Sequence, residues 1–236
     1  MDFNKIKQLV RNRNNNHIEI IDGMNKSILK HPFIMNFSPS KGEFKFLINS
    51  FGGNSTSTLI KFINPYYSKI SNHMWYHLEL KHCLSPPNKY THFFKAIYIY
   101  GDPRESLISI YKRNLQDEHY LNTFQVKKKM PKTIEDYLDN EIDHFQFNKH
   151  HNNWTNKIDN DRKYKILAID YKKLWECKNE ILDFLELPKS KLKDFPLYKK
   201  RHSSINYLNS TYRRKITKMY FDLTKRINER PFIEII

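Results

Sequence analysis

The sequence predicts an α/β fold in three layers, with a central parallel sheet flanked by helices on both faces. Two apolar segments, residues 44–51 and 96–100, are each followed by a glycine-containing turn and then by a helical pattern. Short apolar runs bounded by turn residues are typical of buried strands, and strands that alternate with helices favour a parallel sheet. Because the 236 residues contain no Gly/Ser-rich linker, we expect residues 1–236 to form a single domain.

The expected elements follow one another along the chain. Residues 1–42 are expected to form an N-terminal extension, residues 43–205 the core and residues 206–236 a C-terminal helix. Strands are expected where β-branched and aromatic residues gather, at 44–51, 75–80, 96–100 and 164–170. Helices are expected where apolar residues recur at spacings of three and four, at 56–70, 103–116, 133–154, 174–187 and 211–227.

The sharpest predicted boundary is the turn Gly101-Asp102-Pro103. Glycine tolerates a tight turn, aspartate caps a helix, and proline suits the first helical position because no amide donor is needed there. A helix N-terminus at the end of a strand binds anions readily. Residues 52–58 repeat the order of strand, turn and helix, so the sequence suggests one ligand with two phosphate groups.

The composition favours an anionic ligand. The chain has 41 Lys and Arg against 25 Asp and Glu, a formal charge of +16, which attracts polyanions. The basic residues are spread along the chain without a zinc-finger spacing or an RNA-binding aromatic motif, so we do not expect nucleic acid to be the main ligand.

Two cysteines are too few for a disulfide framework or a structural zinc site. With no apolar signal segment and no run of about 18 apolar residues, a soluble, cytoplasmic protein without a membrane span is expected.

In these strand-to-helix junctions the chain resembles the sulfotransferase family, which has a P-loop-like fold and transfers a sulfuryl group from 3′-phosphoadenosine-5′-phosphosulfate (PAPS) to a hydroxyl or amine. In that family a strand leads into a Pro-Lys-Ser-Gly-Thr-Thr type loop that holds the 5′-phosphosulfate. Consecutive amides and hydroxyls at a helix N-terminus suit this role. Gly53 stands at the position of the family's lysine. The resemblance assigns the loop to Gly52, Gly53, Asn54, Ser55, Thr56, Ser57 and Thr58.

The resemblance extends to the family's 3′-phosphate site. An Arg-Asp-Pro-Arg-Asp pattern with a following serine is matched in order by Asp102, Pro103, Arg104, Glu105 and Ser109, with Gly101 at the position of the first arginine. This implies that Ser109 binds the 3′-phosphate together with Arg104 or Arg113. The resemblance also implies that Tyr171 lines the adenine pocket and that Arg201 and Ser203 belong to a basic loop over the 3′-phosphate.

The segment from Lys81 to Pro86 resembles the family's acceptor-side motif Lys-Thr-His-x-Pro. The resemblance implies that His82 is the general base for the attacking hydroxyl, and an imidazole pKa near 6.5 suits that task at neutral pH. Lys81 is the catalytic candidate for the cation that the loop lacks, with Lys41 and Lys45 as alternatives. Transfer would be in line and would need no metal. The other interpretation of His82 is a purely structural histidine.

Three functions stay open. The first is a sulfotransferase with PAPS as donor and an unknown hydroxyl acceptor, which loops such as 114–131 would select. The second is a catalytically inactive protein of the same fold, because Gly53 and Gly101 replace the family's two principal cations. The third is a basic nucleic-acid-binding protein, whose affinity would fall steeply with salt.

Overall fold

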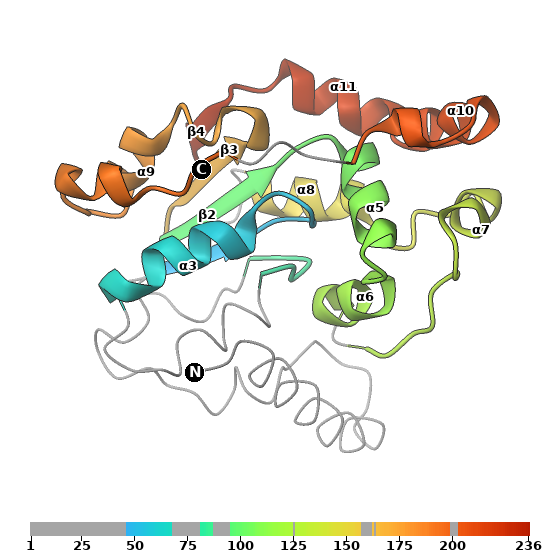
Figure 1. The fold of residues 1–236 in the computed structure, drawn as a ribbon, viewed down its shortest axis with the longest axis horizontal. Helices are drawn as coiled ribbons and strands as arrows, with labels where there is room; N and C mark the ends of the chain where they lie inside the picture. Colours follow the sequence, from blue (N-terminus) through green and yellow to red (C-terminus); the bar gives the residue numbers. More distant parts are fainter. Residues whose placement is uncertain are drawn as a thin grey trace.

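The computed structural model describes residues 46–67, 81–86, 95–124, 126–156, 162, 164–198 and 203–236. At its centre is a four-stranded sheet in the order β1 (Phe46–Asn49), β2 (Lys95–Tyr100), β3 (Ile166–Asp170) and β4 (Ile233–Ile235) (Figure 1). The strands β1, β2 and β3 are parallel, and β4 pairs antiparallel with β3. The α/β class is therefore confirmed, whereas the expectation of a wholly parallel sheet is wrong at β4.

Helices surround the sheet. The α-helices are α3 (Thr56–Tyr67), α5 (Pro103–Lys112), α6 (Gln116–Phe124), α7 (Ile134–Asp139), α8 (Phe147–Thr155), α9 (Lys178–Phe184), α10 (Ser210–Met219) and α11 (Phe221–Glu229). The 3₁₀ turns are η1 (Tyr171–Lys173), η2 (Lys189–Asp194) and η3 (Ile205–Tyr207). The predicted N-terminal extension and the predicted strand at 75–80 lie outside the described residues.

Two apolar cores cover the two faces of the sheet, because alternate side chains of a strand point to opposite faces. Tyr98 and Tyr100 of β2 belong to a core that includes buried residues of α5, α7, α8, α10 and α11. Ile97 and Ile99 belong to the opposite core, which contains buried residues of α3 and α9. The structure therefore has helix, sheet and helix layers, with α3 in front of the strands and α8 behind them in Figure 1.

The predicted helix over 133–154 is two helices, α7 and α8, with a bend between them. Glu141 and Gln146 in the connection have φ angles of 53° and 50°, which are incompatible with a continuous right-handed helix. Asp143 in the same connection accepts hydrogen bonds from the hydroxyls of Tyr137 (3.1 Å) and Tyr220 (2.9 Å). These two hydrogen bonds hold the connection between α7 and α8 against Tyr137 and Tyr220.

The C-terminal region also differs from the prediction of one helix over 206–236. It consists of η3, α10, α11 and the edge strand β4, and the change of direction between α10 and α11 falls at buried Tyr220. In the described part of the chain, no helix combines the length and the apolar character needed to cross a membrane.

Candidate functional site

The loop between β1 and α3 turns through three left-handed residues at the carboxyl end of the sheet. The φ angles are 102° at Gly52, 70° at Gly53 and 56° at Ser55, so glycine relieves strain at two of the three positions. Ser50 closes the loop, because its Oγ accepts from the Gly52 amide (3.1 Å) and shares a 2.6 Å hydrogen bond with the hydroxyl of Thr56. The loop is thus tied to the first residue of α3.

The backbone amides of this loop are available to an anion. Among the described residues, none accepts a hydrogen bond from the amides of residues 53–57, whereas the amides of Thr58 and Leu59 both donate to the Ser55 carbonyl. Successive amides in turns that alternate in hand form concave anion-binding nests, and the N-terminus of α3 adds its positive dipole. The side chain of Ser57 is exposed beside these amides.

Asn54 and Gly101 join this loop to the end of β2. Asn54 is 1% exposed, and its amide nitrogen donates to the Ile99 carbonyl (3.4 Å). A Cβ atom at Gly101 would lie 3.0 Å from Asn54 Oδ1 and 3.3 Å from the Cβ of Tyr171. A side chain at position 101, where the sulfotransferase pattern has arginine, would therefore press on the residues that follow β1 and β3.

His82 and Lys81 lie against the end of β1. The amide of Ser50 donates to the Lys81 carbonyl (2.9 Å), and His82 Nδ1 lies 2.7 Å from the Ser50 carbonyl. Because a carbonyl oxygen only accepts, Nδ1 carries the hydrogen, and Nε2 of the neutral ring keeps its lone pair. This is the tautomer that a general base acting through Nε2 requires.

α8 anchors the 81–86 segment from its other side. Trp154 Nε1 donates to the Cys83 carbonyl (2.9 Å), and Asn153 Nδ2 donates to the Leu84 carbonyl (3.2 Å). Trp154 is fully buried, as expected for a core aromatic residue. The backbone of His82 is therefore fixed by both β1 and α8.

His119 of α6 is a second histidine of the site that sequence reasoning missed. Its ring centroid lies 4.6 Å from that of His82, and its Cε1 lies 2.9 Å from the position that a Cβ atom at Gly52 would occupy. No motif singled out His119, because it lies within the segment 114–131, which was expected only to select the acceptor. Its proximity to His82 arises from packing between elements that are far apart in the chain.

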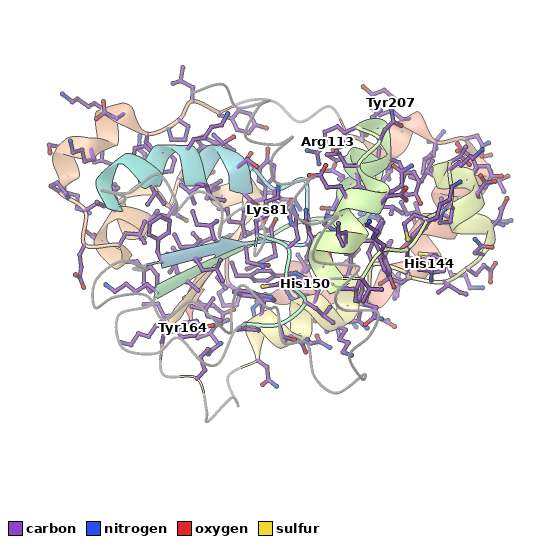
Figure 2. All side chains as sticks on the ribbon, turned by 90° about the horizontal axis from the view of Figure 1, so that it is seen from below. Lys81, Arg113, His144, His150, Tyr164 and Tyr207 are labelled. Carbon is purple, nitrogen blue, oxygen red and sulfur yellow. The ribbon has the colours of Figure 1, made fainter. Side chains whose placement is uncertain are left out.

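Both imidazoles are held neutral. Burial is the main reason that the pKa of His82 lies well below its ordinary value, and His119 and Lys81 lower it further. The pKa of His119 is likewise well below its ordinary value, because of burial first and then the nearby His150, Lys81 and Arg113. Figure 2 shows Lys81 beyond the ends of the strands. The charges that act on these two rings are positive, as expected of an anion site.

The two arginines expected at the 3′-phosphate lie at the two ends of α5. The guanidinium of Arg104 binds the helix cap Asp102 through Nε to Oδ1 (2.9 Å) and through its terminal nitrogen to Oδ2 (2.6 Å). Arg113 Nε donates to the Ser109 carbonyl (2.9 Å) at the opposite end of α5. The two arginines, which are alternatives for the 3′-phosphate, are about 13 Å apart along the helix axis.

Of the remaining predicted nucleotide residues, Tyr171 and Ser203 are described by the structure and Arg201 is not. Tyr171 in η1 is buried against Gly101 and meets Trp175 edge to face at 5.5 Å. Ser203 is buried, and its Oγ has no hydrogen-bond partner among the described residues. Arg201 lies outside the described residues. No group of three His, Cys, Asp or Glu side chains in the described ranges is arranged to hold a metal ion.

The fold and the site define an α/β protein with a candidate anion-binding loop and a neutral histidine at the carboxyl edge of parallel strands. No protein-family model matches the chain, and neither does any curated protein or solved structure.

Proposed function

We propose that the protein is a sulfotransferase that transfers a sulfuryl group from PAPS to a hydroxyl. The observation that carries the proposal is the role of Ser50 in two parts of the site. Its hydroxyl holds the amide-rich loop through Gly52 and Thr56, and its carbonyl orients His82. An anion-binding loop and a general base fixed by one residue suit the transfer of an anionic group to a nucleophile.

The loop has the chemistry to bind the 5′-phosphosulfate. Its order of strand, loop and helix is that of a P-loop-like fold, which supports the finer fold assignment. Each hydrogen bond from an amide to a charged oxygen contributes on the order of 1.5–3 kcal/mol. The amides of residues 53–57 would supply several such bonds without the lysine that Gly53 replaces. Lys81 lies next to His82 and would add a positive charge.

His82 would accept the proton of the acceptor. When bound, PAPS supplies the sulfuryl group, and its bond from sulfur to the 5′-phosphate oxygen breaks as the acceptor oxygen bonds to sulfur. Nε2 of His82 takes the hydroxyl proton as this happens, while Nδ1 keeps its hydrogen bond to Ser50. The lowered pKa of His82 keeps the ring unprotonated at neutral pH, although it also makes the ring a weaker base than an ordinary imidazole.

One contact favours the second candidate, an inactive protein of the same fold. Arg104 is bound by Asp102 through Nε and one terminal nitrogen, so its charge is already compensated and only its remaining donors are left for a 3′-phosphate. The two candidates differ in whether a nucleotide with a 3′-phosphate binds at all.

Amide NMR titration with 3′-phosphoadenosine-5′-phosphate tests the proposal directly on the loop. Because the chain has only 5 glycines, their amide signals are easily resolved and assigned by Gly→Ala or selective labelling. Binding should shift Gly53 and Ser57, and a Ser57→Ala variant should bind more weakly. Ser210→Ala, which removes an exposed serine hydroxyl at the start of α10, is the matched control. Unchanged Gly53 and Ser57 signals at saturating nucleotide would refute the proposal.

A further inference from the structure

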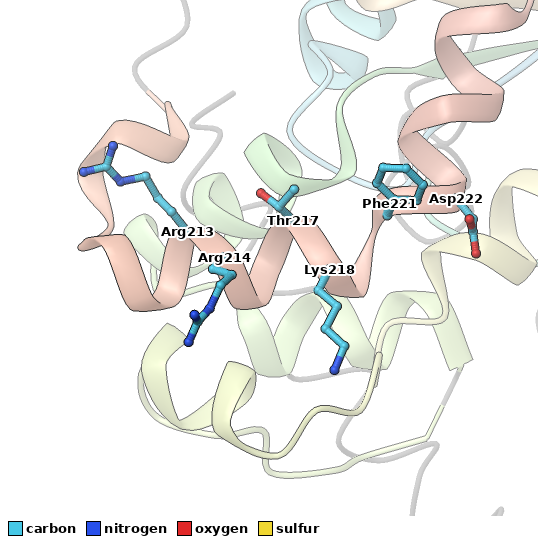
Figure 3. Close-up of a pocket in the computed structure, with 6 residues that line it drawn as sticks. All are labelled: Arg213, Arg214, Thr217, Lys218, Phe221 and Asp222. Carbon is cyan, nitrogen blue, oxygen red and sulfur yellow. The ribbon is translucent and has the colours of Figure 1, made fainter.

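A groove on the outer surface of α10 and α11 lies apart from the candidate site. It is lined by Arg213, Arg214, Thr217 and Lys218 of α10 and by Phe221 and Asp222 of α11. Residues four apart lie on one face of a helix, so Arg214 and Lys218 are neighbours on α10, whereas Phe221 and Asp222 follow the change of direction at Tyr220. Figure 3 shows Arg213 and Thr217 on one side of α10 and Arg214 and Lys218 on the other, and the groove has a volume of about 590 Å³.

The cations of this groove have no ion-pair partner among the described residues. Within those ranges, no carboxylate forms an ion pair with Arg213, Arg214 or Lys218, although Asp222 also lines the groove. The neighbouring Lys215 differs, because it pairs with Asp139 at 2.7 Å. Arg213 donates through Nε to the Leu208 carbonyl (2.9 Å), which fixes its guanidinium near the start of α10. Among the described residues, the groove therefore presents three cations without an ion-pair partner, and one of them, Arg213, is held in place.

The aromatic ring of Phe221 lines the same groove as these cations. Phe221 is 61% exposed, although a ring of this size normally contributes to a core. It is the one aromatic side chain among the described residues that line the groove. A single ring among charged groups offers too little apolar area to bind a bilayer, which needs an extended apolar helix face.

We infer that this groove binds single-stranded nucleic acid. Arg214 and Lys218, one helical turn apart, would contact the phosphate backbone, and Phe221 would stack on a base. Cations that follow the backbone and an exposed aromatic ring are the two features that sequence-tolerant single-strand binding uses. This inference goes beyond the proposed function and does not depend on it, because none of the groove residues belongs to the candidate site.

Fluorescence anisotropy with a labelled oligothymidylate of about ten nucleotides tests the inference. Binding is measured between about 50 and 200 mM salt, where the slope of log K against log salt reports phosphate contacts at about 0.7 per contact. The double variant Arg214→Gln/Lys218→Gln should reduce the magnitude of this slope by about 1.4. The control Lys127→Gln/Lys129→Gln removes the same charge from exposed residues elsewhere and should leave the slope unchanged. Equal slopes in the two double variants would overturn the inference, because overall charge would then account for binding.

Two further measurements distinguish strand binding in the groove from binding in the candidate site. Phe221→Ala should weaken binding by about 5- to 150-fold through lost stacking, whereas Phe232→Ala, which removes another half-exposed ring, should not. An excess of 3′-phosphoadenosine-5′-phosphate should not displace the oligonucleotide. Displacement would place the strand in the candidate site and overturn the inference. Absence of oligonucleotide binding, or binding only to vesicles that contain phosphatidylserine, would also overturn it.

Discussion

His82 Nδ1 lies 2.7 Å from the carbonyl oxygen of Ser50, the residue whose hydroxyl also holds the β1–α3 loop. The relationship fixes the tautomer of His82 and links the candidate base to the candidate anion site through one buried residue. Any movement of Ser50 would therefore disturb both parts together.

Replacement of His82 tests its role as a base. In His82→Asn the side-chain amide can still donate to the Ser50 carbonyl, but it cannot take a proton. We expect transfer of labelled sulfate from PAPS to fall by about 10²- to 10⁴-fold, with donor binding unchanged. The measurement uses phenol, sugar and tyrosine-peptide acceptors. His144→Asn, at a half-buried histidine outside the site, is the control. If His82→Asn kept full activity, the histidine would have only a structural role.

Gly101→Ala tests the close packing of Gly101 against Asn54 and Tyr171, which follow β1 and β3. The new Cβ would meet Asn54 Oδ1 at 3.0 Å, so we expect a loss of about 1–3 kcal/mol in the free energy of unfolding, as for other overpacked sites. Chemical denaturation measures it. In a double-mutant cycle with Asn54→Ala, the losses in unfolding free energy should not add. Asn54→Ala removes the Oδ1 atom that the new Cβ at position 101 would meet. Strict additivity would show that the two residues do not press on each other.

Buried imidazoles make stability depend on pH. Burial lowers the pKa of His150 and of His151 to about 3, so the unfolded chain binds their protons first as the pH falls. The stabilisation is complete above about pH 6.5 and is lost from there down to about pH 3. Each ring should contribute a slope of about 1.4 kcal/mol per pH unit within that window.

Denaturant titrations at several pH values measure this slope. The variant His151→Gln removes one titrating group, so its slope below pH 6.5 should be smaller by about 1.4 kcal/mol per pH unit, whatever its absolute stability. An unfolding free energy that stayed constant or rose on acidification through this window would contradict the buried, neutral state of these histidines.

Asp143→Leu tests what separates α7 from α8. It would remove the acceptor of both the Tyr137 and the Tyr220 hydroxyl and leave each of them only the other, at 3.4 Å, as an acceptor, so we expect a loss of about 1–3 kcal/mol in the free energy of unfolding. Asp139→Leu is the matched control, because this exposed carboxylate pairs with Lys215 and should matter little to the unfolding midpoint. Equal effects in the two variants would show that the tyrosine contacts do not stabilise the bend.

Local signals predicted much of the fold. The turn Gly101-Asp102-Pro103 begins α5 as expected, because Asp102 accepts from the Arg104 amide at 2.9 Å and Pro103 is the first helical residue. Thr133, where the predicted helix over 133–154 begins, caps α7, with its hydroxyl accepting from the Asp136 amide at 3.0 Å. These features depend on residues close together in the chain, which is why the sequence alone indicates them.

Features that depend on distant partners could not be predicted in this way. The bend at Asp143 requires Tyr220 from the far C-terminal region, and β4 consists of three residues that pair only because β3 offers an edge. In the candidate site, His119 approaches His82 through packing of α6, and the binding of Arg104 by Asp102 follows from side-chain geometry. Sequence patterns place residues on elements, but they do not show which elements meet.

The most direct test of the proposed function is calorimetric titration of the wild-type protein with 3′-phosphoadenosine-5′-phosphate and, separately, with AMP. The account predicts binding of the first nucleotide at least about tenfold tighter than AMP, the effect of one charge-assisted contact to the 3′-phosphate. It also predicts that Ser109→Ala reduces this preference, while His82→Asn does not. Equal affinity for the two nucleotides, or no binding of either, would contradict a sulfotransferase donor site.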